Sequence, residues 1–309
     1  MVSPDLSVEL GPLRLRNPVL TASGTFGYGL EFLPFFDIGR LGGIVTKGLS
    51  PRPRVGNPPP RIVETSAGML NTIGLQNVGV DAFIEEKLPE LREHDMAVVA
   101  NVFGETEAEY LEVCRKLDQA DGVAAIELNV SCPNVEEGGM IFGNDPRALG
   151  RITGACRRAT RLPLIVKLSP NVGDIRVTAR AAESGGADIL SLVNTYVGMA
   201  VDVERRQPVL TRISGGLSGP AIRPLAVWLT WQVSRAVKLP IIGMGGIMNA
   251  NDALEFILAG ASAVQIGTAN FVDPCASIKV LEGLTDYLTR HEIGSLRELV
   301  GSLRTAVEA

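Results

Sequence analysis

The stretch IIGMGGIMNANDALEFILAGASAVQIG, residues 241–267, holds one complete strand–helix–strand unit. Residues 241–245 form an apolar run of strand length, residues 251–259 have helical periodicity, and residues 263–267 form a second apolar run. Short apolar runs that alternate with amphipathic helices are typical of parallel sheets built from βα repeats. This unit therefore predicts an α/β fold.

The same alternation extends through the rest of the chain. Six further strands are predicted, at residues 18–23, 43–47, 97–102, 124–129, 164–168 and 189–194. Helices are predicted at residues 81–93, 107–119, 145–160, 174–184 and 220–236. Eight strand–helix units over about 250 residues predict a (β/α)8 TIM barrel. A doubly wound open sheet is the competing architecture, but it usually has fewer strands at this length.

Two additions to the barrel are predicted. Residues 6–15 alternate apolar and polar positions around Gly11-Pro12, which predicts an N-terminal β-hairpin that closes the barrel floor. Segment 50–79 is rich in proline and glycine and too long for a plain connection, so we interpret it as a functional βα-loop insertion. No linker or low-complexity tract interrupts the chain, and residues 1–309 are predicted to form a single domain.

Composition excludes several classes of function. Hydrophobic residues make up 46% of the chain and charged residues 20%, a globular balance, and the net charge of −5 argues against a nucleic-acid partner or an anionic membrane. The start of the chain resembles no signal peptide, and no apolar stretch is long enough to span a membrane, so we expect a cytoplasmic protein. The four cysteines form no Cys-x-x-Cys pair, and His94 and His291 lie in charged surroundings. A bound metal and a Ser-His-Asp hydrolase are therefore not expected.

Polar residues recur at or near the ends of the predicted strands: Ser23, Lys47, Asn101, Asn129, Lys167 and Asn194. In a barrel, the catalytic face is where the strands end. Each lysine could instead cap a strand and pair with a carboxylate. Six polar strand ends together predict an active site at this rim.

Strands seven and eight end in the glycine-containing segments 243–247 and 265–269. Glycines allow backbone amides to approach a phosphate closely, and this is the usual phosphate site of a barrel. Glycines also serve tight turns, and the pattern alone does not separate a phosphorylated substrate from a cofactor such as flavin mononucleotide (FMN).

Cys132 lies just past the fourth strand, in the loop Asn129-Val130-Ser131-Cys132-Pro133-Asn134. Cys114 and Cys156 fall in helical segments and are interpreted as inert buried residues. Cys132 has polar neighbours at the catalytic face, and with no histidine nearby, a Cys-His protease pair is not supported. A thiol that acts as base toward a carbon acid is the remaining role.

Over nearly its whole length, the sequence resembles the dihydroorotate dehydrogenases of pyrimidine biosynthesis. The resemblance is carried by Lys47-Gly48, by residues 71–77 (NTIGLQN), by the Asn-x-Ser-Cys-Pro-Asn loop, by Val193-Asn194-Thr195 and by the two glycine segments. Cysteine at the base position resembles class 1, and residues 135–139 resemble class 1B, which reduces NAD.

The resemblance implies that Cys132 removes a proton from C5 of dihydroorotate while C6 delivers a hydride to FMN. Lys167 would lie near the flavin N1–O2 edge, and Lys47 would contact flavin and substrate. The flavin-binding residues implied are Ser23, Lys47, Gly48, Asn101, Asn129, Lys167, Val193, Gly219, Gly245, Gly246, Gly267 and Thr268. The substrate-binding residues implied are Lys47, Asn71, Thr72, Ile73, Gly74, Leu75, Asn129, Asn134, Asn194 and Thr195.

Class 1B also implies an electron-transfer subunit that carries FAD and a [2Fe-2S] cluster, and a homodimer of catalytic chains within a heterotetramer. Two alternatives stay open. One is another FMN barrel, similar to the pyrimidine-reducing domain of dihydropyrimidine dehydrogenase. The other is a flavin-free phosphate-binding barrel, a lyase or isomerase that forms a Schiff base at Lys167.

Overall fold

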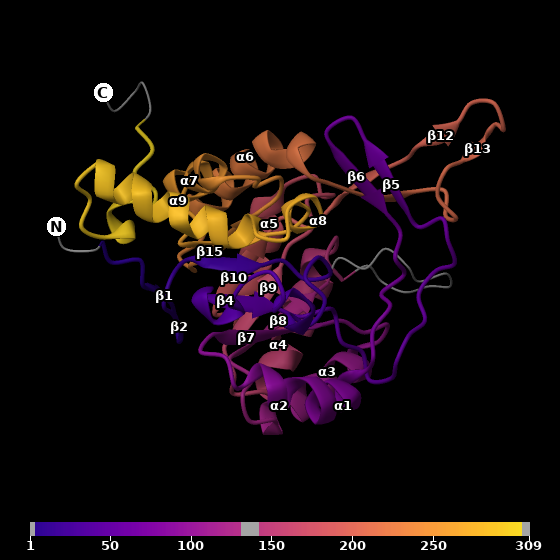
Figure 1. Ribbon diagram of the computed structural model, residues 1–309. Coiled ribbons are helices and arrows are strands. Elements are labelled where there is room, and N and C mark those ends of the chain that lie inside the picture. Colours follow the sequence, from indigo (N-terminus) through magenta and orange to yellow (C-terminus); the bar gives the residue numbers. More distant parts are fainter. Residues whose placement is uncertain (1–3, 131–141, 305–309) are drawn as a thin grey trace.

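The computed structural model describes residues 4–130 and 142–304. Eight parallel strands form a closed barrel in chain order, with the last strand pairing with the first (Figure 1). The barrel strands are β3 (Val19–Thr21), β4 (Gly43–Val45), β7 (Ala97–Val102), β8 (Ala125–Asn129), β9 (Leu164–Lys167), β10 (Ile189–Leu192), β15 (Ile241–Met244) and β16 (Ala263–Ile266). The predicted TIM barrel is therefore confirmed.

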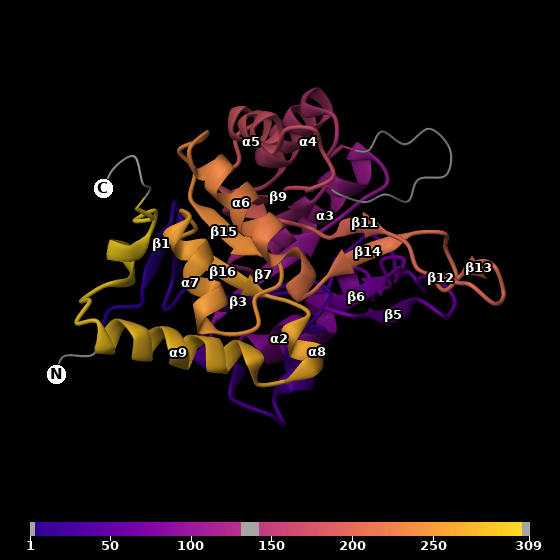
Figure 2. The ribbon, with the colours of Figure 1, turned by 90° about the horizontal axis from the view of Figure 1, so that it is seen from above.

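Helices surround the barrel in the order that a right-handed βα repeat requires (Figure 2). They are α1 (Val80–Ala82), η3 (Phe83–Lys87), α2 (Leu88–Leu91), α3 (Glu107–Gln119), α4 (Pro146–Ala159), α5 (Ile175–Ser184), α6 (Arg223–Ser234), α7 (Ala250–Leu258), α8 (Ala269–Val272) and α9 (Ala276–Arg290). Between β3 and β4 the chain forms only the short 3-10 turns η1 (Leu30–Phe32) and η2 (Ile38–Arg40). Two further 3-10 turns are η4 (Pro220–Ile222) and η5 (Leu296–Leu299).

Side-chain caps fix where several of these helices begin. Thr106, Asp145, Asp174 and Asn249 each accept a hydrogen bond from a backbone N–H in the first turn of α3, α4, α5 and α7. The predicted start of the helix at residues 145–160 is thus confirmed, with Pro146 in the first turn. Asp273-Pro274 does not begin a helix in the same way, because Asp273 accepts from the Cys275 N–H and α9 begins at Ala276.

The helix predicted at residues 81–93 is interrupted by a π-helical turn, η3 (Phe83–Lys87). Pro89, in the first turn of α2, has no N–H to donate to the carbonyl four residues earlier. The regular hydrogen-bond ladder cannot continue through that position, and the wider turn before it takes up the break.

The predicted hairpin is confirmed as β1 (Val8–Leu10) and β2 (Leu13–Leu15), joined by Gly11-Pro12. A Cβ on Gly11 would lie 3.6 Å from the backbone oxygen of Asp188, the residue before β10. The turn therefore lies at the N-terminal ends of the strands, on the barrel floor.

A second sheet stands over the opposite end of the barrel. Segment 50–79 contributes β5 (Ile62–Thr65) and β6 (Gly68–Asn71), which pair with β14 (Gly215–Ser218) and β11 (Tyr196–Gly198) in the order β11-β14-β6-β5. The small hairpin β12 (Val201–Asp202) and β13 (Gln207–Pro208) extends beyond it (Figures 1 and 2). The insertion at residues 50–79 was predicted, whereas the strands after β10 were not.

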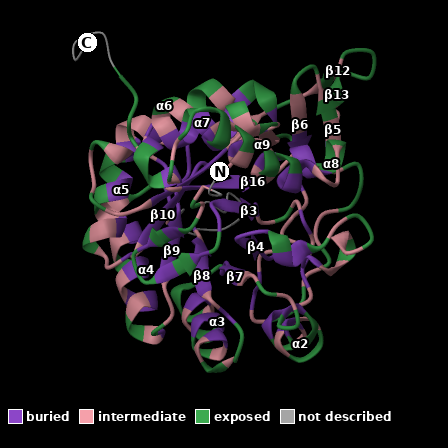
Figure 3. Cartoon of the chain, turned by 60° about the vertical axis from the view of Figure 1, so that its left-hand side comes forward, coloured by how far each residue is buried: buried purple, intermediate pink, exposed green. Residues whose placement is uncertain are grey.

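The core lies inside the barrel and between the barrel and its helices, as the buried strands in Figure 3 show. Strands buried on both faces read as continuous apolar runs, and β4, β10, β15 and β16 are buried at every residue. Near the C-terminal ends of the strands, however, the buried residues include Asn101, Glu127, Lys167, Ser191 and Gln265. Among the described residues, no helix is both long and apolar enough to cross a membrane.

Candidate active site

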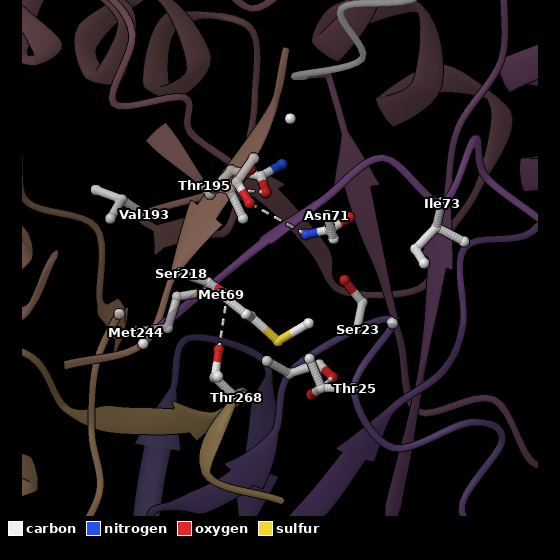
Figure 4. Close-up of a pocket in the computed structure, with 18 of the residues that line it drawn as sticks. Ser23, Thr25, Met69, Asn71, Ile73, Val193, Thr195, Ser218, Met244 and Thr268 are labelled. Atoms are coloured by element: carbon white, nitrogen blue, oxygen red, sulfur yellow. Dashed lines mark hydrogen bonds between the residues drawn. The ribbon is translucent and has the colours of Figure 1, made fainter. Parts of the chain in front are cut away.

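A cavity of about 610 Å³ lies between the C-terminal ends of the barrel strands and the sheet β11-β14-β6-β5 (Figure 4). This volume is in the range of small-molecule and cofactor sites. Residues at or just after the C-terminal end of every barrel strand line this cavity, from Ser23 after β3 to Gly267 after β16. The second sheet contributes Met69, Asn71 and Ser218, which Figure 4 shows turned toward the same space.

All predicted site residues that the structure describes line this one cavity. They are Ser23, Lys47, Gly48, Asn71, Thr72, Ile73, Gly74, Leu75, Asn101, Asn129, Lys167, Val193, Asn194, Thr195, Gly219, Gly245, Gly246, Gly267 and Thr268. The topology therefore brings together positions up to 245 residues apart in the chain (268 − 23). Cys132 and Asn134 lie outside the described residues. The role of each residue toward a ligand stays a prediction.

The two lysines of the cavity differ in their surroundings. Lys167, on β9, donates to the Ser23 hydroxyl at 3.2 Å and lies 3.9 Å from a carboxylate oxygen of Glu127. The side-chain ammonium of Lys47, after β4, makes no hydrogen bond or ion pair with any described residue. Burial, followed by the nearby charge of Arg61, lowers the pKa of Lys47 below its usual value. An unpaired cation in a concave site is suited to an anionic ligand group.

Amide side chains line the same cavity as Lys47. Asn194 donates to the side-chain oxygen of Asn129 at 3.2 Å and accepts from the Thr195 N–H at 2.8 Å, which fixes its orientation. Asn71 donates across the sheet to the Gly216 carbonyl at 3.4 Å. A Cβ on Gly216 would lie 2.2 Å from the Thr195 hydroxyl oxygen, so only glycine allows β14 to pass this close. Neutral amides provide both donors and acceptors, as a ring with imide groups requires.

Glycines shape the other end of the cavity. Gly246 has φ of 76°, and a Cβ there would lie 2.7 Å from the Gly219 carbonyl oxygen, so the two loops approach without side chains between them. A Cβ on Gly267 would meet nothing closer than 3.5 Å. Thr268 donates to the Ser218 hydroxyl at 2.8 Å and ties the rim to the second sheet (Figure 4). This open cradle after β15 and β16 matches the predicted phosphate position.

Sequence reasoning missed part of the site. Gln265 lines the cavity from β16, and the buried Glu127 on β8 holds cavity residues in place from below. A signal was present, because Glu127 precedes Asn129 by two residues and Gln265 precedes Gly267 by two. Alternate residues of a strand point to the same face, so both belong to the inward face that the strand ends define.

Comparison with known proteins gives a consistent result. The family model described as dihydroorotate dehydrogenase matches residues 5–288. The chain is 58% identical over 304 residues to a Geotalea daltonii protein named "Dihydroorotate dehydrogenase B (NAD(+)), catalytic subunit", covering 98% of this chain and 100% of that one. A Trichlorobacter lovleyi protein of the same name is 58% identical over 302 residues, covering 98% and 99%.

Among solved structures, the chain is similar to the dihydroorotate dehydrogenase of Eimeria tenella in complex with ferulenol. The TM-score is 0.82 at 23% sequence identity, covering 96% of this chain and 88% of that one. At this identity the likeness supports the barrel fold. The family match, which spans most of the chain, and the high identity to the two bacterial proteins also support membership of the family. On these grounds the chain belongs to the dihydroorotate dehydrogenase family.

Proposed function

We propose that residues 1–309 form a single FMN-binding domain that oxidises dihydroorotate to orotate in pyrimidine biosynthesis, as the catalytic subunit of an NAD-linked enzyme. The observation that carries this proposal is that the Lys47 ammonium, which has no hydrogen bond or ion pair with a described residue, lines the same cavity as the amides of Asn71 and Asn194. Dihydroorotate is a small ring that carries a carboxylate and imide groups. The cavity offers a cation for the first and amides for the second.

The cavity residues fit a flavin. The carbonyl oxygens of Asn101 and Gln265 are buried and have no hydrogen-bond partner among the described residues, although both side chains line the cavity. They are acceptors for the N–H of an isoalloxazine ring. Lys167 supplies a cation for the polar edge of the ring, and Gly245, Gly246, Gly267 and Thr268 form the cradle for the phosphate.

In this proposal Lys47 holds the substrate carboxylate. Contacts to the ring are assigned to the amides of Asn71, Asn129, Asn134 and Asn194, the Thr195 hydroxyl, Thr72 and the backbone of Ile73, Gly74 and Leu75. Flavin contacts are assigned to Ser23, Gly48, Val193 and Gly219. Opposed placement of ring and cofactor is what hydride transfer requires.

The chemistry removes one proton and one hydride from the substrate. Cys132 accepts the proton from C5 as general base. A flavin held by these residues would supply the acceptor for the hydride that leaves C6. A C5–C6 double bond forms, and the product is orotate. Lys167 offsets the negative charge that reduction brings to the polar edge of the ring.

The family match does not favour either alternative. A barrel similar to dihydropyrimidine dehydrogenase acts on rings without a carboxylate, which would leave the Lys47 ammonium without a ligand group. A flavin-free Schiff-base lyase would leave the Asn101 and Gln265 acceptors unused.

Anaerobic mixing with dihydroorotate tests the proposed function. The purified protein should carry a yellow flavin, and the substrate should bleach its visible absorption as hydride enters the ring. Dihydrouracil, which lacks the carboxylate, is the matched control and should bleach it far more slowly. A colourless protein, or a flavin that dihydroorotate leaves oxidised, would contradict the proposal.

We further propose a partner subunit that carries FAD and a [2Fe-2S] cluster, with catalytic chains paired as a homodimer within a heterotetramer in the cytoplasm. This rests on the names of the two bacterial relatives, which include "catalytic subunit" and "NAD(+)". It also rests on sequence, because none of the four cysteines forms a Cys-x-x-Cys pair that would suit a cluster in this chain.

The chain alone is expected to reduce NAD⁺ far more slowly than it is itself reduced by dihydroorotate. The physical reason is that a flavin enclosed in a cavity needs a relay to a separate nicotinamide site. Stopped-flow mixing of the dihydroorotate-reduced chain with NAD⁺ measures this rate. A small artificial dye as acceptor is the control and should be reduced quickly. Rapid NAD⁺ reduction without a second subunit would exclude the partner.

A further inference from the structure

Glu127 is a fully buried acid inside the barrel, below the floor of the cavity. Its side chain is 0% exposed, and it lies on β8 two residues before Asn129. It does not line the cavity, and the proposed reaction gives it no step. Burying a carboxylate costs free energy unless hydrogen-bond donors or positive charges nearby compensate its negative charge.

Side chains from four strands compensate the charge of this carboxylate. Asn101 on β7 donates to one carboxylate oxygen at 2.7 Å, and Lys167 on β9 lies 3.9 Å from the same oxygen. The hydroxyl of Ser191 on β10 and the amide of Gln265 on β16 each donate to the other oxygen at 2.8 Å. Every neighbour in this set presents a polar hydrogen or a positive charge, which suits an ionised carboxylate.

This arrangement determines the direction of two amides. An ionised carboxylate only accepts hydrogen bonds, so Asn101 and Gln265 must turn their NH₂ groups toward Glu127. Their carbonyl oxygens then face away from it, and neither has a hydrogen-bond partner among residues 4–130 and 142–304. Because both side chains also line the cavity, the orientation set by Glu127 makes them acceptors rather than donors for a bound ring.

We propose that Glu127 is a positioning residue for the bound flavin. Its carboxylate fixes Asn101 and Gln265 as acceptors and compensates the charge of Lys167 inside the barrel. This inference rests on the proposed function, because the ligand that it orients is the flavin. It adds a means by which the chain sets the affinity and the reduction potential of that flavin.

Glu127→Gln tests the inference through flavin binding and potential, without the substrate. Whichever way the new amide points, its NH₂ group faces the NH₂ group of Asn101 or of Gln265. That cavity amide must then turn its oxygen toward residue 127 and its own NH₂ toward the flavin N–H. Affinity for oxidised FMN should fall about tenfold. Lys167 would also lose its counter-charge, and an uncompensated cation favours the reduced, more negative flavin.

The midpoint potential is therefore expected to become more positive. A tenfold change in the ratio of affinities for reduced and oxidised flavin corresponds to about 30 mV for a two-electron couple. Reconstitution of the apoprotein, followed by flavin fluorescence quenching, gives the affinity. Reductive titration against a reference dye gives the potential. A loss of packing alone would weaken both redox forms equally and leave the potential unchanged.

Two matched variants separate charge from geometry. Glu127→Asp keeps the charge but shortens the reach, so FMN should bind more weakly at an unshifted potential. Ser191→Ala removes one hydrogen-bond donor to the carboxylate. Ser191 does not line the cavity, so this variant should leave the midpoint potential of the flavin unchanged. If Glu127→Gln does not fold, Glu127→Asp carries the test, and wild-type FMN affinity in that variant would overturn the inference.

The outcomes distinguish this inference from the function on which it rests. Wild-type protein that binds FMN, together with a Glu127→Gln variant of unchanged or more negative potential, overturns the role of Glu127 alone. Wild-type protein that binds no FMN overturns the proposed function and this role with it.

Discussion

Cys132→Ser is expected to retain FMN and to lose turnover with dihydroorotate at neutral pH by about 100-fold or more, the usual contribution of a positioned general base. A thiol with a pKa of about 8.5 needs only a small downward shift to act as a base near neutrality, whereas a serine hydroxyl ionises far above this range. The deficit should shrink as the pH rises. Steady-state turnover over a pH series, with flavin content measured in parallel, checks both effects.

The control for this variant is Cys275→Ser. Cys275 lies at the start of α9, its thiol is directed to the Phe35 carbonyl at 3.8 Å, and it does not line the cavity. This substitution should leave turnover and its pH profile as in the wild type. Near-wild-type activity of Cys132→Ser at neutral pH would show that another group removes the C5 proton.

Lys47→Met is expected to weaken orotate binding by about 100-fold, because truncating one partner of a desolvated charge pair costs about 2 to 5 kcal/mol. Binding of uracil, which has the same ring without the carboxylate, should change little. Equilibrium titration of the flavin spectrum with each ligand measures the two dissociation constants. Equal losses for orotate and uracil would mean that Lys47 does not bind the carboxylate.

A pH signature accompanies this effect. The carboxylate binds the charged ammonium, so wild-type affinity for orotate is complete below the pKa of Lys47 and is lost as the pH rises through it. Burial and the Arg61 charge lower this pKa, so the loss begins at lower pH than for an ordinary lysine. The dependence should vanish in Lys47→Met. Lys279→Met, which removes an exposed lysine paired with Asp273 at 2.6 Å, is the control and should change neither constant.

The barrel strands could be predicted because burial on both faces leaves a continuous apolar run, as in β15 (Ile241–Met244). The C-terminal ends of β7 and β8 were predicted correctly, whereas those of the other six barrel strands were predicted one or two residues too long. Residues such as Ser23 follow the last residue that pairs in the ladder, and their sequence does not mark that end. The second sheet was not predicted, although the insertion at residues 50–79 that supplies two of its strands was. β14 (Gly215–Ser218) is glycine-rich, and it pairs with β6, whose Asn71 lies opposite Gly216. No local pattern reveals a partner so distant in sequence.

The amino-acid sequence by itself determined the repeating βα pattern, the polar strand ends at one rim and the two glycine segments, because these depend on local periodicity and residue type. Only the tertiary structure decided which of these groups are paired. Closure of the barrel places the Glu127 carboxylate against Lys167, whereas the Lys47 ammonium has no hydrogen bond or ion pair in the part of the chain that the structure describes. Two lysines that look alike along the chain thereby acquire different electrostatic surroundings, since charge compensation depends on distance in space and not on separation in sequence.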